Sequence, residues 1–303
     1  MMEKKKKDLW IFSIASFLND VGSDMVNAVW PIFVTSVLGA NMAVLGLLDG
    51  LGEVLVSISG AVSGYLSDKF GKRKAFIWLG YLLSSIARVG YALSRSAIHL
   101  VPFKALDRLG KIRGPPRDAM IADAQKYKER GGAFGLLRAM DNLGAFVGIV
   151  LAILLIQHVG YVNLFLLAAL PSLAAAALIM LAIKENKGRV KKVKMSLSKF
   201  DNNFRLFLVV SGIFALAAFS YSFFIVFANQ LGYSYYIVPI FYLIFALSAS
   251  VFSIPLGMLS DRIGRRKVIA IAYMSFAVIC LSLIHISEPT RPLYISYAVF
   301  CLK

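Results

Sequence analysis

The chain has 303 residues, a formal net charge of +17, 59% hydrophobic residues and a mean hydropathy of +0.73. A soluble domain cannot bury that much apolar surface, whereas a lipid bilayer can accommodate it. On a soluble protein this charge would indicate nucleic-acid binding, but here the basic residues lie in short loops between apolar runs, so we predict a membrane protein with no nucleic-acid partner.

The first apolar run follows four lysines within residues 1–8. A signal peptide is the alternative, but the run is too long, contains Asp20 and Asp24, and lacks a small-residue cleavage site. Because a hydrocarbon core of about 30 Å needs roughly 20 helical residues, we expect membrane-spanning helices at 9–38, 43–66, 75–94, 98–124, 132–157, 161–184, 204–230, 236–259 and 268–286.

Basic residues gather at one set of helix ends, namely 4–7, 69–74, 126–130, 184–199 and 262–267. The opposite loops hold almost nothing basic besides Arg95. Basic loops stay in the cytoplasm, so we predict a multi-pass protein of the cytoplasmic membrane with a cytoplasmic N-terminus.

The order of the runs predicts four regions: an N-terminal six-helix bundle at 1–184, a cytoplasmic basic linker at 185–203, a partial second bundle at 204–280 and a non-native tail at 281–303. Residues 287–292 place two prolines and two charges within six residues, which cannot continue a membrane helix. The tail resembles translated sequencing-adapter sequence, and a short natural tail is the alternative. On the first interpretation the native continuation is missing, and we expect the chain as written not to transport.

One pattern, G-x-x-x-D-[KR]-x-G-[KR]-R-K, occurs once in each half of the chain, between apolar runs. An internal repeat of this length is typical of transporters built from two halves. The positions that carry it are Gly64, Asp68, Gly71 and Arg73 in the first copy, and Gly257, Asp261, Arg262, Gly264, Arg265 and Arg266 in the second.

This pattern resembles the loop signature of the major facilitator superfamily, found between helices 2 and 3 and again between helices 8 and 9. The resemblance covers residues 9 to about 280. It implies an all-α membrane protein with a complete N-terminal half and a partial C-terminal half, about nine transmembrane helices in all. In the family each loop latches one conformation across the halves. By resemblance we expect Asp261 near the helix start at 131–135, and Asp68 without its partner, which would lie on an absent helix 11.

The resemblance also implies secondary active transport of a small molecule, with the site between the halves. Our first expectation is proton-coupled efflux of a small organic solute, and proton-coupled uptake is the second. A membrane fragment without transport activity is the third. Gly144 and Gly148 match a glycine motif of family exporters, but Ile149 replaces the proline that follows it there. We expect these glycines, with the pairs Gly46/Gly50 and Gly60/Gly64, to allow close helix packing.

No other chemistry is indicated. Cys280, Cys301 and three histidines show neither a disulfide framework nor metal-ligand spacing, and no G-x-x-x-x-G-K-[ST] loop is present. We therefore expect no enzyme activity, no ATP-driven pump, no metal and no cofactor.

Charged residues inside the spans are the candidate functional residues, because each costs about 2.5–3.5 kcal/mol at a helix centre. The carboxylates form pairs four residues apart, each pair on one helix face. We predict that they face the interior of the N-terminal bundle and carry protons. By resemblance, Arg108 or Arg113 matches a helix-4 arginine of the family that is linked to proton transfer. The predicted substrate and proton pathway comprises Asp20, Asp24, Asp49, Glu53, Arg108, Arg113 and Asp141.

A structural interpretation stays open for the polar fourth and fifth spans. Lys104 with Asp107, Asp107 with Lys111, and Arg138 with Asp141 are spaced to pair along their own helices. The Gly114-Pro115-Pro116 break likewise fits either a site or a plain kink.

Overall fold

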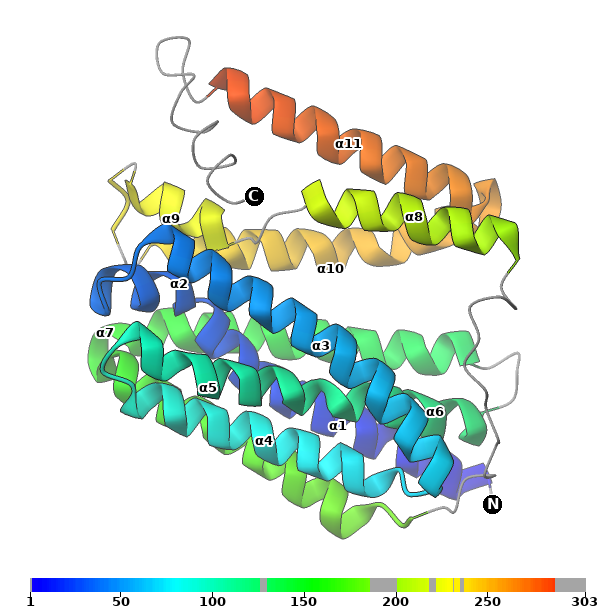
Figure 1. Cartoon of the computed structure of the whole chain (residues 1–303). Helices are drawn as coiled ribbons and strands as arrows, with labels where there is room; N and C mark the ends of the chain where they lie inside the picture. The colour runs from blue at the N-terminus through cyan, green and yellow to red at the C-terminus, as the bar shows by residue number, and fades with distance from the viewer. Residues whose placement is uncertain are drawn as a thin grey trace. The chain divides into compact units, whose positions relative to one another are not determined.

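The computed structural model describes residues 2–125, 130–185, 201–217, 222–230, 232–234 and 237–286. These belong to two compact units: unit 1 comprises Met1–Met195 and Ser220–Leu247, and unit 2 comprises Ser196–Phe219 and Ser248–Lys303. Every regular element among the described residues is a helix, which confirms the all-α prediction (Figure 1). The region predicted as linker lies mostly outside the described residues, as do residues 287–292.

The helices follow the predicted spans. Unit 1 contains α1 (Met2–Asn27), α2 (Trp30–Ile32), the π-helical turn η1 (Phe33–Val37), α3 (Met42–Phe70), α4 (Lys74–Leu93), α5 (Ala97–Leu109), the 3-10 turn η2 (Gly110–Arg113), α6 (Gly114–Ala124), α7 (Arg130–Ala182) and α9 (Ser222–Gln230). Unit 2 contains α8 (Asn202–Ala217) and α11 (Arg265–Ile286), and α10 (Val238–Ile263) contributes to both units.

Helix α7 contains the two spans predicted at 132–157 and 161–184. Gly160 separates them with φ 71° and ψ 177°, a backbone conformation that favours glycine. Figure 1 shows the two limbs of α7 turning back at one end of unit 1. The fourth span is also interrupted: η2 follows α5, and Pro115 and Pro116 occupy the first turn of α6.

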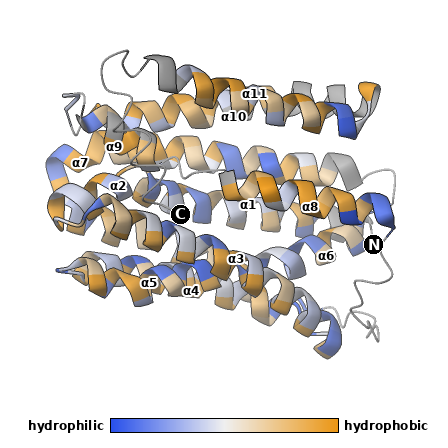
Figure 2. Ribbon diagram, turned by 45° about the horizontal axis from the view of Figure 1, so that its top comes forward, coloured by the Kyte–Doolittle hydropathy of each residue, from blue (hydrophilic) through white to orange (hydrophobic). Residues whose placement is uncertain are grey.

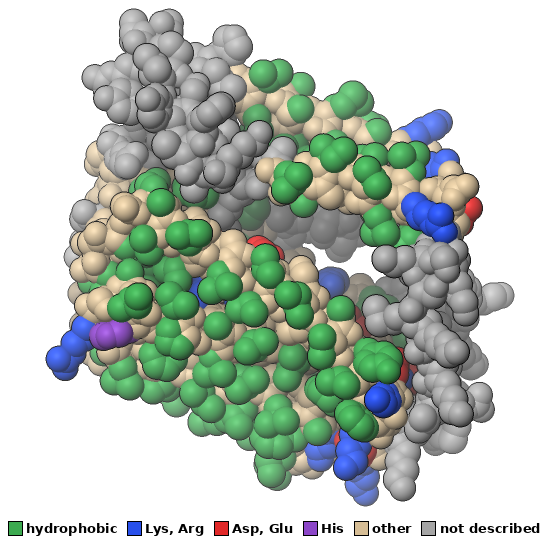
Figure 3. Space-filling model, viewed as in Figure 1, with side chains coloured by type: hydrophobic (Ala, Val, Ile, Leu, Met, Phe, Trp, Pro, Cys, Tyr) green, Lys and Arg blue, Asp and Glu red, His purple; other side chains and the backbone are tan. Residues whose placement is uncertain are grey.

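Three described helices are long and apolar enough to cross a membrane by length and composition: Met42–Phe70, Lys74–Leu93 and Ala133–Ala182. Helix α3 exposes a stripe of large apolar side chains at helical spacing, comprising Leu47, Leu51, Val54, Ile58 and Val62. Figure 3 shows hydrophobic side chains covering this face of unit 1, with Lys and Arg toward its ends. Such a face suits contact with lipid.

The two copies of the repeated pattern end their helices in the same way. Gly71 follows α3 with φ 64°, and Gly264 follows α10 with φ 95°. Helices commonly end with a residue of positive φ after the last turn, and glycine adopts this conformation without a side-chain clash. This explains the second glycine of each copy.

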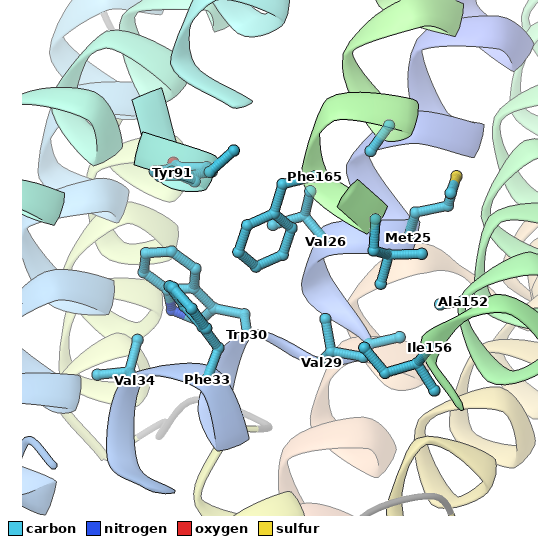
Figure 4. Close-up of a cluster of buried hydrophobic side chains, with 14 of the residues drawn as sticks. Met25, Val26, Val29, Trp30, Phe33, Val34, Tyr91, Ala152, Ile156 and Phe165 are labelled. Carbon is cyan, nitrogen blue, oxygen red and sulfur yellow. The ribbon is translucent and has the colours of Figure 1, made fainter. Parts of the chain in front are cut away.

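The core of unit 1 consists of two buried clusters. One surrounds Trp30, whose ring centroid lies 4.9 Å from that of Tyr91, and includes Phe33 packed edge-on against Phe165 at 4.9 Å (Figure 4). The other is centred on Ile77, Tyr81, Leu137 and Ile179.

Helices α1 and α7 approach closely because glycines face α1. A Cβ on Gly144 would lie 3.1 Å from the Cα of Phe17, and one on Gly148 would lie 3.1 Å from the backbone nitrogen of Met25. This confirms the packing role predicted for the pair. Gly60 and Gly64 lie against Pro115, whereas Gly50 faces open space, so the prediction fails for Gly50.

Unit 2 brings α8 against α11 through aromatic side chains. Phe214 stacks on Tyr273 at a centroid distance of 4.0 Å, and the Tyr273 hydroxyl lies 3.2 Å from Ser211 Oγ. Figure 2 shows hydrophobic residues along most of α11 and a hydrophilic end.

Candidate functional site

A polar cavity lies inside unit 1, between α1, α2, α4, α5 and η2. Its volume is about 30 Å³, room for about two water molecules. The lining side chains are Ser23, Val26, Asn27, Trp30, Arg88, Tyr91, Lys104, Asp107, Arg108 and Lys111.

Lys104 joins α5 to α3 across this cavity. Its side chain is 3% exposed, and its Nζ lies 3.2 Å from Asp49 Oδ1 and 4.0 Å from the centroid of the Trp30 ring. Asp49 also accepts hydrogen bonds from Trp30 Nε1 at 3.3 Å and from Ser222 Oγ at 2.6 Å. A buried ion pair persists only when its remaining hydrogen-bonding capacity is met, and these neighbours meet it.

The carboxylates of α1 accept hydrogen bonds from neutral donors. Asp24 is buried and accepts from Tyr242 Oη of α10 at 2.7 Å and from Asn27 Nδ2 at 3.1 Å. Asp20 accepts from Asn19 Nδ2 at 2.9 Å. The hydrogen-bond donors to both carboxylates are therefore neutral groups.

Arg88 binds three elements together from its position in α4. Its guanidinium donates to the Ala168 carbonyl at 2.8 Å, to Ser172 Oγ and to Ser23 Oγ at 2.8 Å. It also reaches the carbonyl of Asn19 at 3.2 Å. The side chain is 1% exposed, and it forms no ion pair with any residue that the structure describes.

The remaining charged lining residues come from the end of α5 and from η2. Arg108 packs over Gly52 of α3, where a Cβ would lie 3.1 Å from its Nε. Within the described part of the chain, Asp107 and Lys111 make neither a hydrogen bond nor an ion pair. Lys111 therefore brings N–H donors without a hydrogen-bond partner among the described residues to the cavity wall, where the charges of Asp20 and Asp107 act on it.

Arg113 is separate from the cavity. It donates to the carbonyl of Gly110 at 2.9 Å and to Ser84 Oγ at 3.3 Å, and its guanidinium lies 4.8 Å from the centre of the Tyr81 ring. Its contacts hold η2 against α4, which favours a structural role.

Asp141 belongs to a second polar group, formed by α1, α6 and α7. It accepts hydrogen bonds from Ser16 Oγ and from Arg138 Nη1, the latter at 3.2 Å. Buried Arg117 donates to the same Ser16 Oγ at 2.7 Å and pairs with Asp118 at 3.1 Å. The predicted pair along the fifth span, Arg138 with Asp141, is confirmed.

The predicted pathway residues thus separate into groups. Asp24, Asp49 and Arg108 gather at or beside the cavity, with Asp20 one turn along α1, whereas Arg113 and Asp141 belong to other contacts. Glu53 is exposed on α3 and joins none of these groups.

The first repeated loop forms a charge network at one end of unit 1. Arg73 pairs with Asp68 at 2.8 Å and with Asp123 at 2.6 Å. Burial alone lowers the pKa of Arg73, but its hydrogen bonds to Asp123 and Asp68 outweigh burial, so the pKa lies above its usual value. Glu185 Oε1 accepts from the backbone nitrogens of Arg73 at 2.8 Å and Lys74 at 3.3 Å. A carboxylate at this helix start accepts hydrogen bonds from free N–H groups, and its negative charge interacts favourably with the positive end of the helix dipole.

The latch predicted for the second repeated loop involves Asp261. The side chains of Asp261, Arg262 and Arg265 lie outside the described part of the structure. The predicted neighbour of Asp261 at 131–135 therefore stays a prediction.

Sequence reasoning did not place Trp30, Tyr91, Asn27 or Ser23 in the site, and it left Lys104, Asp107 and Lys111 as possible pairs within one helix. Lys104 pairs with Asp49 instead of Asp107, so the intrahelical interpretation was wrong for this residue. The sequence feature that pointed to these residues was the high density of charge in the fourth span. It indicated a polar surface but did not identify the residue that pairs with Lys104.

Known proteins resemble the chain over most of its length. The profile of the Major Facilitator Superfamily matches residues 12–303. An uncharacterized MFS-type transporter of Methanocaldococcus jannaschii, MJ1317, is 35% identical over 97% of this chain and 78% of its own length. The multidrug resistance protein MdtH of Aeromonas hydrophila is 28% identical over 71% of this chain and 56% of its own length.

Among solved structures, a bacterial homolog to the human lysosomal transporter Spinster, inward-facing and unoccupied, aligns with a TM-score of 0.65 at 20% identity. That alignment covers 87% of this chain and 64% of the other, so the chain spans about two thirds of that transporter and just over half of the MdtH protein. The profile match, the first relative and the helical architecture lead to one conclusion: the chain belongs to the Major Facilitator Superfamily.

Proposed function

We propose that the chain is part of a secondary transporter that exports a small organic solute in exchange for protons. The observation that carries this proposal is the cavity of unit 1, where the Asp49–Lys104 pair and the lining charges lie within apolar helices. Charges at such positions are costly and mark transport pathways and proton relays. Resemblance to a multidrug resistance protein favours export.

Proton exchange requires carboxylates that gain and lose protons as access alternates. Asp49 and Asp24 fit this role because residues of α9 and α10 donate to them. Ser222 reaches Asp49 at 2.6 Å and Tyr242 reaches Asp24 at 2.7 Å. Protonating either carboxylate would weaken a contact between the N-terminal helices and the later ones. Proton binding is thereby linked to helix movement.

The test uses everted membrane vesicles from cells that make the chain, energised to be acidic inside and loaded with a pH-sensitive dye. We expect added organic acids, amines or uncharged solutes that are exported to release protons and restore dye fluorescence. Vesicles with Asp24→Asn should show no response, because this change removes a proposed proton-carrying carboxylate whose hydrogen-bond donors are neutral. Proton-linked accumulation in right-side-out vesicles alone would establish uptake, and no movement in either orientation would support the inactive-fragment alternative.

We further propose that the N-terminus and the loop at 71–73 face the cytoplasm, because basic residues dominate that end. In a background with Cys280→Ser and Cys301→Ser, an impermeant thiol reagent should label Lys72→Cys only after the membrane is opened. Arg95→Cys, the matched control from an opposite loop, should react in intact cells. The reverse pattern would overturn this orientation.

A further inference from the structure

We infer that the cavity of unit 1 binds the anionic head group of a small organic solute, a carboxylate or phosphoryl group held by Lys111 and Arg108. This rests on the proposed transport function and names its substrate class. It departs from the efflux analogy, which by itself specifies no charge for the solute.

The charge of the wall favours an anion. Four basic side chains, Arg88, Lys104, Arg108 and Lys111, line the cavity with one acidic side chain, Asp107. A concave wall of one sign concentrates ligands of the opposite sign, and low-dielectric surroundings strengthen the effect.

Two of the neighbouring carboxylates, Asp49 and Asp24, are already engaged by donors and so do not offer a cation site. Asp49 already accepts from Lys104, Trp30 and Ser222, and Asp24 accepts from Asn27 and Tyr242. An incoming ammonium group would have to displace these donors. Lys111 makes no hydrogen bond or ion pair within the described residues, although the charges of Asp20 and Asp107 act on it. Its three N–H groups can therefore donate to the oxygens of a bound anion.

The size and the apolar walls restrict the ligand further. A volume of about 30 Å³ fits a charged head group, whereas pockets that enclose a whole drug-sized molecule measure roughly 300–1,000 Å³. Trp30 and Tyr91 line the cavity and continue into the aromatic cluster with Phe33 and Phe165 (Figure 4). The cavity therefore has room for a charged head group beside the rings of Trp30 and Tyr91.

The experiment measures binding to the purified chain in detergent by calorimetry and thermal shift, independent of transport. The probes share one ring and differ in charge: benzoate, phenylphosphonate, uncharged benzamide and cationic benzylamine. We expect the two anions to bind and to stabilise the chain, and the other two not to. If the unmodified chain preferred benzylamine, or bound benzamide and benzoate equally well, the inference would be overturned.

Lys111→Gln should weaken benzoate binding at least about tenfold, because a charge-assisted hydrogen bond is lost. Lys111→Arg should retain binding, since it keeps the charge, and the exposed Lys7→Gln should leave it unchanged. Benzoate binding that survives Lys111→Gln would contradict the inference. If anions bind but no proton-driven movement is found, the transport proposal fails and the assignment of the anion site stands.

Discussion

Replacing Asp49 by asparagine is expected to lower the free energy of unfolding by about 3–5 kcal/mol. Asparagine keeps the shape of the side chain but removes its charge. Lys104, whose side chain is 3% exposed, would then keep a buried positive charge with no carboxylate at 3.2 Å. Unfolding by sodium dodecyl sulfate titration of the purified chain, followed by circular dichroism, measures the change.

Two comparisons isolate the ion pair. Glu53→Gln removes a carboxylate one turn along the same helix, where the side chain is exposed, and should change stability by less than about 0.5 kcal/mol. Adding Lys104→Met to Asp49→Asn should recover most of the loss, because the unpaired charge is gone. Equal destabilisation by Glu53→Gln, or no recovery in the double variant, would contradict the pairing.

The fold was accessible from the sequence because the bilayer imposes a length and an apolar composition on each helix. The run containing Gly160 was correctly divided into two spans, and the repeated pattern marked two equivalent helix ends. The glycines of that pattern, Gly71 and Gly264, each follow the end of a helix with a positive φ. These features depend on residues that are close together in the chain, so they can be recognised in a single sequence.

The site was predictable only in part because its contacts join residues far apart in the chain. Spacing along one helix suggested Lys104 with Asp107, yet Lys104 pairs with Asp49 of α3. Ser222 and Tyr242 reach the carboxylates from α9 and α10, and nothing in the sequence around either residue indicates such a partner. Intrahelical spacing carries no information about which helices pack together.

The first signature loop illustrates the same limit. Its Asp68 and Arg73 were recognised from the pattern, and the structure pairs them. The carboxylate at the start of α4, however, comes from Glu185, at the far end of the bundle in sequence. The sequence indicated that helix starts attract carboxylates, but the identity of this one depended on where α7 ends.

Replacing Gly148 by leucine is the second change with a large expected effect. A Cβ at this position would meet the backbone of α1, at the carbonyl of Val21 and 3.1 Å from the nitrogen of Met25. Backbone atoms of a packed helix cannot move aside as a flexible side chain can, so α7 would have to shift away from α1. We expect a loss of about 1–3 kcal/mol or more in the free energy of unfolding, measured by the same titration.

Gly135 of the same helix provides the matched control, because a Cβ there would have nothing within 4 Å. Gly135→Leu should leave stability unchanged or raise it by up to about 1 kcal/mol, since leucine favours a helix more than glycine does. The comparison holds the substitution and the helix constant and varies only the contact with α1. If Gly148→Leu were as stable as Gly135→Leu, close approach of α1 and α7 would not be what positions Asp24, and with it one side of the cavity.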